Sequence, residues 1–217
     1  MRHEVALLFG HIGGVLADDL ARAWPGRVEV RKLSSEGGFA LVSSTIRMTR
    51  GMALICLGRV HEGLAETDAG LAEFRSTGTI KPDYLTLAAW TYVLARPAEE
   101  ALKLIDEILA SAQAVGEFRA EVVMQHLRGR LLLKLGAADE AEAEKCFRNA
   151  IAIAQRALAK GLELPPTSSL ARLLAKQGKR EEARAMLEDI YNWFTEGFDT
   201  ADLRDAKALL DELASPA

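Results

Sequence analysis

The amino-acid sequence predicts an all-α fold built from stacked pairs of helices. Three observations lead to this prediction. Apolar residues recur at helical spacing, and no strand-like alternation persists anywhere in the chain. Gly or Pro interrupts the helical pattern roughly every 15 to 20 residues, which delimits about eleven helices joined by short turns. Small residues also recur at a regular interval along the chain, which is typical of a repeat protein.

The composition fits a globular or solenoid protein and argues against several functions. The chain has 217 residues, of which 49% are hydrophobic and 27% charged, with a formal net charge of −4. That balance does not indicate disorder, and no apolar window reaches the length of about 18 residues that a membrane span needs. No Lys/Arg block supplies the basic face that nucleic-acid binding requires. We therefore expect neither nucleic acid nor a membrane as a partner.

The helix breaks are read from Gly and Pro along the chain. They are expected at Pro25-Gly26, Gly37-Gly38, Gly58, Gly78, Arg96-Pro97, Gly116, Gly136, Gly161, Pro165-Pro166, Gly178 and Gly197. Because Pro is tolerated in the first turn of a helix, Pro165 or Pro166 is expected to open its helix after a longer loop.

Each predicted pair has a small residue on its first helix and another about twelve residues later, where two backbones approach closely. The matches are Gly51 with Gly63, Ala89 with Ala101, Gly129 with Ala143 (two residues longer), and Ala171 with Ala183. The leading positions Gly51, Ala89, Gly129 and Ala171 are 38, 40 and 42 residues apart. This spacing lies between the period of about 34 of tetratricopeptide repeats and that of about 40 to 47 of armadillo or HEAT repeats. The small-x3-large-x2-small pattern of the second helices favours the tetratricopeptide type.

The two ends of the chain depart from the regular pairs. Residues 3–36 are expected to hold a degenerate pair that lacks a polar cap. At the other end, Asp199 or Thr200 can cap a final helix, whose stripe Leu203, Ala206, Leu210 and Leu213 would close the open core. We expect a single domain over residues 1–217: a degenerate pair in 1–37, four repeats in 38–197, and a capping helix with a tail in 198–217.

Several segments carry a family resemblance. They are residues 143–150 (AEKCFRNA), 169–173 (SLARL), 177–179 (QGK), 182–184 (EAR) and above all 193–200 (WFTEGFDT). The chain resembles the C-terminal tetratricopeptide region of large bacterial signalling proteins. In those proteins a cyclase or DNA-binding module is followed by an ATPase module and then by these repeats. The resemblance implies a right-handed superhelical solenoid and a regulatory or scaffolding role in signal transduction.

No catalytic chemistry is expected. The chain has no Gly-x4-Gly-Lys-Ser/Thr loop and no strand-rich segment with paired aspartates, so ATPase and cyclase activities are not carried over. His3, His11, His61 and His126 are scattered and predict no metal site. Cys56 and Cys146 lie in apolar helical contexts and are read as buried thiols of a cytoplasmic protein. We expect no cofactor.

The predicted binding site is the groove lined by the first helix of each pair. Counting along each first helix from its small packing residue places nine side chains there: Met48, Met52, Thr86, Trp90, Gln125, Arg130, Ser168, Arg172 and Lys176. A groove that is half apolar and half basic would suit a peptide with hydrophobic anchors and an acidic end. The alternative is that the methionines and Trp90 are core and the basic residues ordinary surface.

Two other functions remain open. A sensor module could bind a small molecule in the groove and control an attached cyclase or ATPase effector; a deep apolar pocket with a few convergent polar groups would favour it. Self-association through the uncapped helix in residues 3–24 is also open. The first hypothesis is a non-catalytic module that binds a protein or peptide partner.

Overall fold

The protein is described from a computed structural model over residues 40–136 and 139–215. This part of the chain contains nine α-helices and no strand, as the sequence predicts. The helices are α3 (Ala40–Cys56), α4 (Val60–Ser76), α5 (Pro82–Ala95), α6 (Ala98–Val115), α7 (Phe118–Leu135), α8 (Glu140–Arg156), α9 (Lys160–Lys176), α10 (Arg180–Trp193) and α11 (Ala201–Ala214). The degenerate pair expected in residues 3–36 lies outside the described residues.

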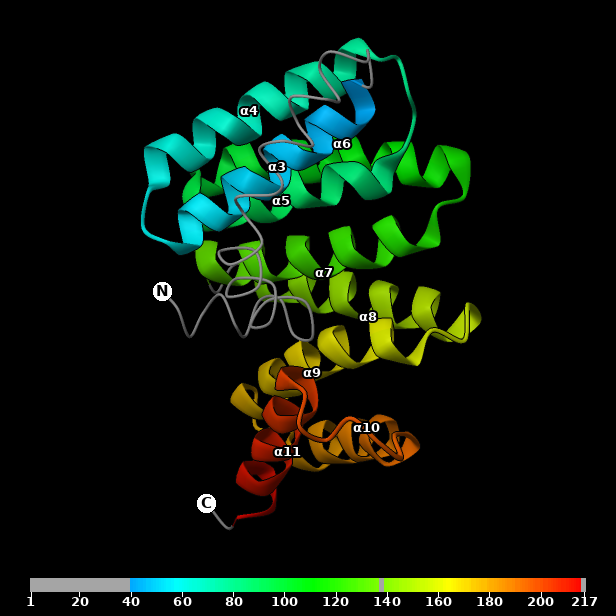
Figure 1. The fold of residues 1–217 in the computed structure, drawn as a ribbon. Helices are drawn as coiled ribbons and strands as arrows, with labels where there is room; N and C mark the ends of the chain where they lie inside the picture. The colour runs from blue at the N-terminus through cyan, green and yellow to red at the C-terminus, as the bar shows by residue number, and fades with distance from the viewer. Residues whose placement is uncertain (1–39, 137–138, 216–217) are drawn as a thin grey trace.

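The helices stack in chain order, from α3 and α4 at the top of Figure 1 to α10 and α11 at the bottom. Each helix packs against the next one along the chain. In addition, α3 contacts α5, α5 contacts α7, α7 contacts α9, and α9 contacts α11. No comparable contact joins the even-numbered helices among the described residues. The odd-numbered helices α3, α5, α7, α9 and α11 therefore form one continuous row, here called the odd row.

Small residues lie where the helices of a pair approach closely. A Cβ atom built on Gly51 would come within 2.5 Å of the carbonyl oxygen of Gly63, and one on Gly63 within 2.6 Å of the carbonyl oxygen of Gly51. Such distances are too short for any side chain, so only glycine fits at both positions. The Gly51–Gly63 contact predicted from the sequence is confirmed. On the second helix of a later pair, Ala143 is fully buried, and its partner Gly129 packs against the ring of Phe147.

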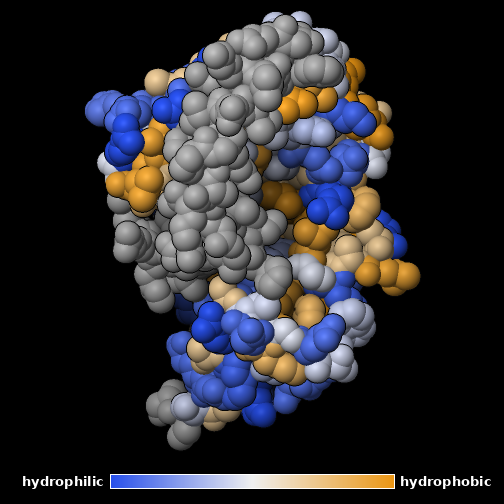
Figure 2. All heavy atoms as spheres, in the orientation of Figure 1, coloured by the Kyte–Doolittle hydropathy of each residue, from blue (hydrophilic) through white to orange (hydrophobic). Residues whose placement is uncertain are grey.

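Apolar side chains fill the space between the helices as two main clusters. The first joins Met48 of α3 to residues of α4, α5, α6 and α7, and the second runs from α7 to α11. Phe147 of α8 is fully buried in the second cluster. On the face shown in Figure 2, hydrophilic side chains predominate at the lower end, over the C-terminal helices. The core thus runs along the stack, as expected for a repeat protein in which each unit packs on its neighbours.

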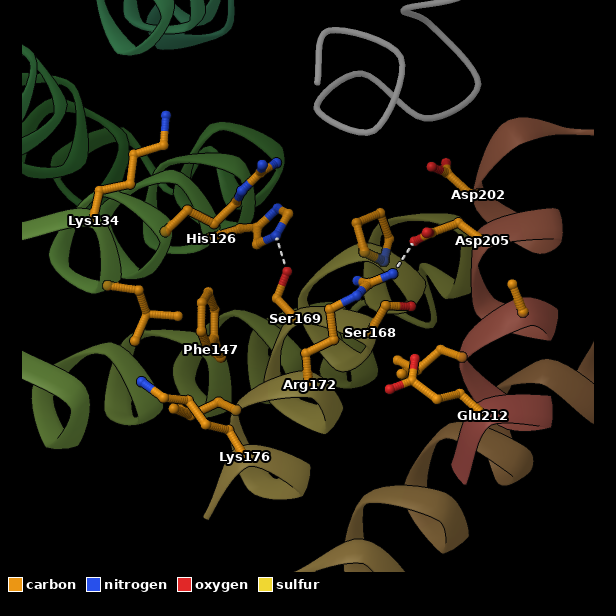
Figure 3. A pocket seen from close by; sticks show the side chains of 16 residues that line it. His126, Lys134, Phe147, Ser168, Ser169, Arg172, Lys176, Asp202, Asp205 and Glu212 are labelled. Carbon is orange, nitrogen blue, oxygen red and sulfur yellow. Dashed lines mark hydrogen bonds and ion pairs between the residues drawn. The ribbon is translucent and has the colours of Figure 1, made fainter. Parts of the chain in front are cut away.

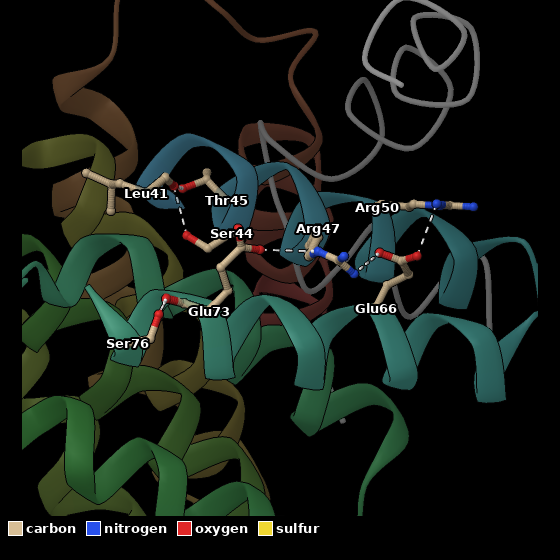
Figure 4. A network of polar contacts seen from close by, with 8 residues as sticks. All are labelled: Leu41, Ser44, Thr45, Arg47, Arg50, Glu66, Glu73 and Ser76. Carbon is tan, nitrogen blue, oxygen red and sulfur yellow. Dashed lines mark hydrogen bonds and ion pairs between the residues drawn. The ribbon is translucent and has the colours of Figure 1, made fainter. Parts of the chain in front are cut away.

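Ion pairs run along the α3–α4 contact (Figure 4). Arg47 pairs with Glu66 at 3.4 Å and with Glu73 at 3.2 Å, and Arg50 pairs with Glu66 at 3.0 Å. Their side chains keep about a fifth to a third of their surface exposed, so each pair contributes at most about 1 kcal/mol. The close glycine contact, rather than these charges, sets the distance between α3 and α4.

Two glycines and one leucine end their helices in the same way. Gly58 after α3, Gly178 after α9 and Leu158 after α8 all have positive φ, which is 54° for Leu158. The next amide then donates to the carbonyl five residues earlier in each case, as from Ala159 to Ala154 at 2.9 Å. This is the Schellman arrangement, for which glycine is favoured because a Cβ atom is strained at positive φ.

Replacing Leu158 by glycine is expected to stabilise the protein. The left-handed conformation costs a non-glycine residue about 1–2 kcal/mol, which glycine does not incur. Glycine in turn loses roughly 0.5–1 kcal/mol more conformational entropy on folding, so the net change still favours glycine. The Leu158 side chain is 85% exposed, so its removal sacrifices little packing. Calorimetry should show a melting temperature raised by about 2 °C. Gly178→Ala, at the equivalent turn, should lower the melting temperature. If the Leu158→Gly variant melted at a lower temperature than the parent protein, the backbone at Leu158 would not be strained.

The helix break expected at Gly161 and at Pro165-Pro166 is wrong. Helix α9 begins at Lys160 and includes both prolines. The amides of Leu162 and Glu163 donate to the carbonyl of Ala159, so the first turn forms before the prolines are reached. Since proline has no N–H, Pro165 and Pro166 leave two carbonyls of that turn without helical donors. The turn lies instead at residues 157–159.

Helix α11 closes the stack against α9 and α10. Its side chains Leu203, Ala206, Leu209 and Leu213 are buried. The helix begins after Thr200, one of the two predicted caps, although the Thr200 side chain makes no capping hydrogen bond. At its other end Arg180 of α10 donates from Nη2 to the carbonyl oxygens of Glu212, Leu213 and Ser215 at 2.8, 3.3 and 3.0 Å. A cation on the last carbonyls stabilises the helix end.

Candidate functional site

A cleft of about 630 Å³ lies on the odd row, between α7, α9 and α11 (Figure 3). Helix α7 lines it with His126, Arg130, Leu133 and Lys134, α9 with Pro165, Ser168, Ser169, Arg172, Leu173 and Lys176, and α11 with Asp202, Asp205, Ala208, Leu209 and Glu212. Among the described residues, Phe147 of α8 is the one lining residue from an even-numbered helix. The cleft is therefore built mainly by α7 and α9, which the sequence predicts to line a groove, and by α11, which it predicts only as a cap.

A buried histidine joins α7 to α9 in the cleft. Nε2 of His126 on α7 shares a hydrogen bond of 2.8 Å with Oγ of Ser169 on α9, and the His126 ring lies 5.9 Å from the Phe147 ring. Burial holds the pKa of His126 well below its ordinary value, and the positive charges of Arg130 and Arg172 lower it further. The imidazole is therefore neutral at physiological pH and acts as a structural hydrogen-bonding group.

This depressed pKa makes stability depend on pH. Above an unfolded pKa of about 6.5, His126 is neutral in both states. Below pH 6.5, roughly, the unfolded chain binds a proton at His126, whereas the folded chain keeps the imidazole neutral because its pKa is lowered. Stability is therefore lost as the pH falls. We expect His126 to account for about 1 kcal/mol of lost stability between about pH 7 and pH 5.5. Urea unfolding at both pH values checks this. His126→Gln can still form a hydrogen bond with Ser169 but does not titrate, so this variant should lose less stability on acidification than the parent protein. If the parent and the variant lose the same stability, His126 is not the cause.

The cleft has walls of opposite charge. Its basic wall, on α7 and α9, comprises Arg130, Lys134, Arg172 and Lys176; its acidic wall, on α11, comprises Asp202, Asp205 and Glu212. Arg172 reaches across from α9 to pair with Asp205 at 2.5 Å (Figure 3). Lys176 pairs with Glu140 of α8 at 2.5 Å. Charged groups on three rigid helices can therefore meet a ligand in a fixed arrangement.

Ser168 of α9 presents a hydroxyl to the cleft. Ser168 is only 5% exposed as a whole residue, but its Oγ is not one of the buried side-chain atoms that lack a hydrogen-bond partner. Figure 3 shows its hydroxyl directed from α9 toward α11, between the two charged walls.

Four of the nine predicted groove residues line this cleft together: Arg130, Ser168, Arg172 and Lys176. The others do not. Met48 and Met52 are 0% and 2% exposed, so the expectation that they face the groove is wrong. Met48 packs against side chains of α4 and α5 in the core. Thr86, Trp90 and Gln125 are half-buried on α5 and α7, outside the cleft.

The sequence prediction missed His126, Lys134 and the whole acidic wall. His126 and Lys134 lie four residues before and after Arg130, one helical turn away, so the same counting on α7 could have included them. The acidic residues lie on the final helix outside its apolar stripe, where charged residues are ordinarily solvent-exposed. Nothing in their spacing indicates that this face of α11 lines a cleft opposite α7 and α9.

The two cysteines are not activated thiols. Burial raises the pKa of both the Cys56 and the Cys146 thiol, although Arg128 beside Cys146 acts in the opposite direction. Across the described ranges 40–136 and 139–215, no group of three or more His, Cys, Asp or Glu residues is placed to hold a metal ion. Nor is any helix there long and apolar enough to cross a membrane.

No protein-family model matches the chain, and a search of curated proteins finds none that is significantly similar to it.

Proposed function

We propose that this protein is a non-catalytic interaction module of the tetratricopeptide type, which binds a peptide segment of a partner protein in the cleft on its odd row. The observation that carries the proposal is the placement of the cleft. It lies on the one continuous row of helices, and its lining includes four residues that repeat counting assigned to a groove. In a right-handed superhelix of helix pairs, this row lines the concave face, which such proteins use for binding.

Recognition would rest on preorganised charges and a partly apolar floor. Arg130 and Arg172 carry planar guanidinium groups that can donate two parallel hydrogen bonds to one carboxylate. Leu133, Leu173 and Leu209 supply apolar surface beside them. Since these side chains extend from packed helices, little conformational entropy is lost on binding. An acidic group flanked by an apolar anchor is the ligand that this arrangement favours.

The proposed setting is bacterial signal transduction in the cytoplasm. It rests on the resemblance of residues 143–150 and 193–200 to the tetratricopeptide region of cyclase and ATPase signalling proteins. In that setting the module would hold a partner beside an attached effector, and it would contribute no chemistry of its own.

Selection from a random peptide library displayed on phage tests the proposal. We expect enrichment of peptides that contain an acidic residue next to an apolar one. Arg130→Ala combined with Lys176→Ala should abolish their binding. The matched control, Arg119→Ala on α7 with Lys103→Ala on α6, removes two exposed charges outside the cleft and should leave binding unchanged. Peptides that bind the cleft variant as well as the parent would refute the site.

A small-molecule sensor is the second candidate, and the size of the cleft favours it. Its volume of about 630 Å³ falls within the range of roughly 300–1,000 Å³ typical of ligand sites. A ligand that binds only the folded state raises the melting temperature in proportion to its concentration. Thermal shifts with a panel of small carboxylates that disappear in Arg130→Ala would favour the sensor over the peptide module.

A further inference from the structure

The charges around the cleft divide into two sets on different helices. Four cationic side chains come from α7 and α9, whereas three carboxylates come from α11. His126 is neutral, so it does not alter this division. A uniformly acidic ligand that reached the basic wall would also face the acidic wall, where like charges repel it. The cleft is therefore poorly suited to a purely anionic occupant.

The Arg172–Asp205 ion pair shows how close the two walls are. It links α9 to α11 directly, at 2.5 Å, so a side chain from one wall reaches the other. Arg130 and Lys134 lie on the α7 side of this pair, and Asp202 and Glu212 lie on α11. A ligand lying across the cleft would thus have cations at one end and carboxylates at the other.

The Ser168 hydroxyl lies between these two ends. Ser168 lines the cleft, and its hydroxyl is directed toward the acidic wall. A hydroxyl can both donate and accept, and a peptide backbone offers both groups. The amide of an extended segment crossing from α7 to α11 would meet this hydroxyl.

We propose that the cleft selects a dipolar peptide segment, with a carboxylate side chain at the α7 side of the basic wall, a short apolar spacer, and an ammonium or guanidinium side chain at Asp202 and Glu212. The inference rests on the proposed peptide-binding function and adds the charge pattern of the partner. It also assigns Ser168 as the residue that bonds the spacer backbone. The cleft volume of about 630 Å³ suits a segment of a few residues.

Fluorescence anisotropy with capped, labelled six-residue peptides tests this pattern. The dipolar peptide has two glutamates, two leucines and two lysines, synthesised in both orders. The comparison peptides carry glutamate or lysine at all four charged positions. We expect the better dipolar peptide to bind at least about ten-fold more tightly than either comparison peptide, with an affinity that weakens as salt is added.

Variants of each wall report on the two charges separately. Glu212→Gln should weaken the dipolar peptide and strengthen the all-glutamate peptide, whereas Arg130→Gln should weaken both. Ser168→Ala should weaken the dipolar peptide about three-fold through loss of one hydrogen bond. The same substitutions outside the cleft, Glu188→Gln on α10 and Arg119→Gln on α7, should leave all affinities unchanged.

Two failures are distinguishable. If the all-glutamate peptide binds the parent protein as tightly as the dipolar one, the dipolar pattern is overturned while peptide binding in the cleft stands. If no peptide of the set binds, and library selection also returns none that depends on Arg130, both proposals fall. An unchanged affinity in Ser168→Ala would remove Ser168 from the site.

Discussion

Replacing Phe147 by alanine is expected to lower the free energy of unfolding by about 3–5 kcal/mol. The ring is fully buried in the cluster that runs from α7 to α11, and it packs against Gly129 and His126. Its loss removes apolar burial and leaves a cavity beneath the cleft. Urea unfolding monitored by circular dichroism measures the effect. A loss below about 1 kcal/mol would show that the ring is not a close-packed part of the core.

A second substitution at Gly129 tests the same contact from the other side. A Cβ atom at Gly129 would come within 2.6 Å of Cε1 of Phe147, so Gly129→Ala should destabilise the parent protein. In the Phe147→Ala background the obstacle is gone, and alanine is favoured over glycine in a helix by about 1 kcal/mol. The sign of the Gly129→Ala effect should therefore reverse. Additive effects of the two substitutions would contradict direct packing.

Ending the chain at Thr200 is expected to produce the other large effect. Helix α11 buries Leu203, Leu209 and Leu213, each worth roughly 1.5–3 kcal/mol, or about 4.5–9 kcal/mol together. That is comparable with the total stability of about 5–15 kcal/mol of an ordinary domain. Without α11, apolar side chains of α9 and α10 such as Leu187 and Ile190 lose their cover. We expect a much lower melting temperature and aggregation, measured by calorimetry and light scattering.

A chain ending at Ser215 is the matched control, because it retains all of α11 and the carbonyls that Arg180 contacts. It should melt like the parent and stay monodisperse. If the chain ending at Thr200 were equally soluble and heat-resistant, α11 would not be a cap. The shorter chain also lacks the acidic wall of the cleft, so it should lose any preference for dipolar peptides.

Much of the fold could be predicted from the residues because the helix ends and close contacts have local signatures. Gly58 and Gly178 mark turns that need positive φ, and Gly51 and Gly63 mark a contact with no room for side chains. The turn at Leu158 could not be predicted, since a leucine in the left-handed region has no signal in the sequence. The position of Pro165 and Pro166 inside α9 could not be predicted for a related reason. They forbid two hydrogen bonds but do not forbid a helix that has already begun.

The site was only partly predictable, because periodicity assigns a side chain to a helix face but does not say what packs on that face. Arg130 and Arg172 follow the small packing residues Gly129 and Ala171 and do reach the cleft. Met52 holds the same place after Gly51, yet α3 packs so closely on its neighbours that Met52 is buried. The acidic wall depends on the angle at which α11 returns to α9. That angle is a property of the assembled stack.

The short range of the helix contacts has a consequence for how the chain acquires its structure. The substantial contacts among the described helices join elements no more than two positions apart in the chain. Proteins dominated by such local contacts fold quickly, because little chain must be closed into loops before packing begins. Helix α3, for example, has its described partners α4 and α5 once Ala95 has been synthesised. The stack can therefore assemble in order on the ribosome, and among the described helices the cleft is completed last because it needs α11.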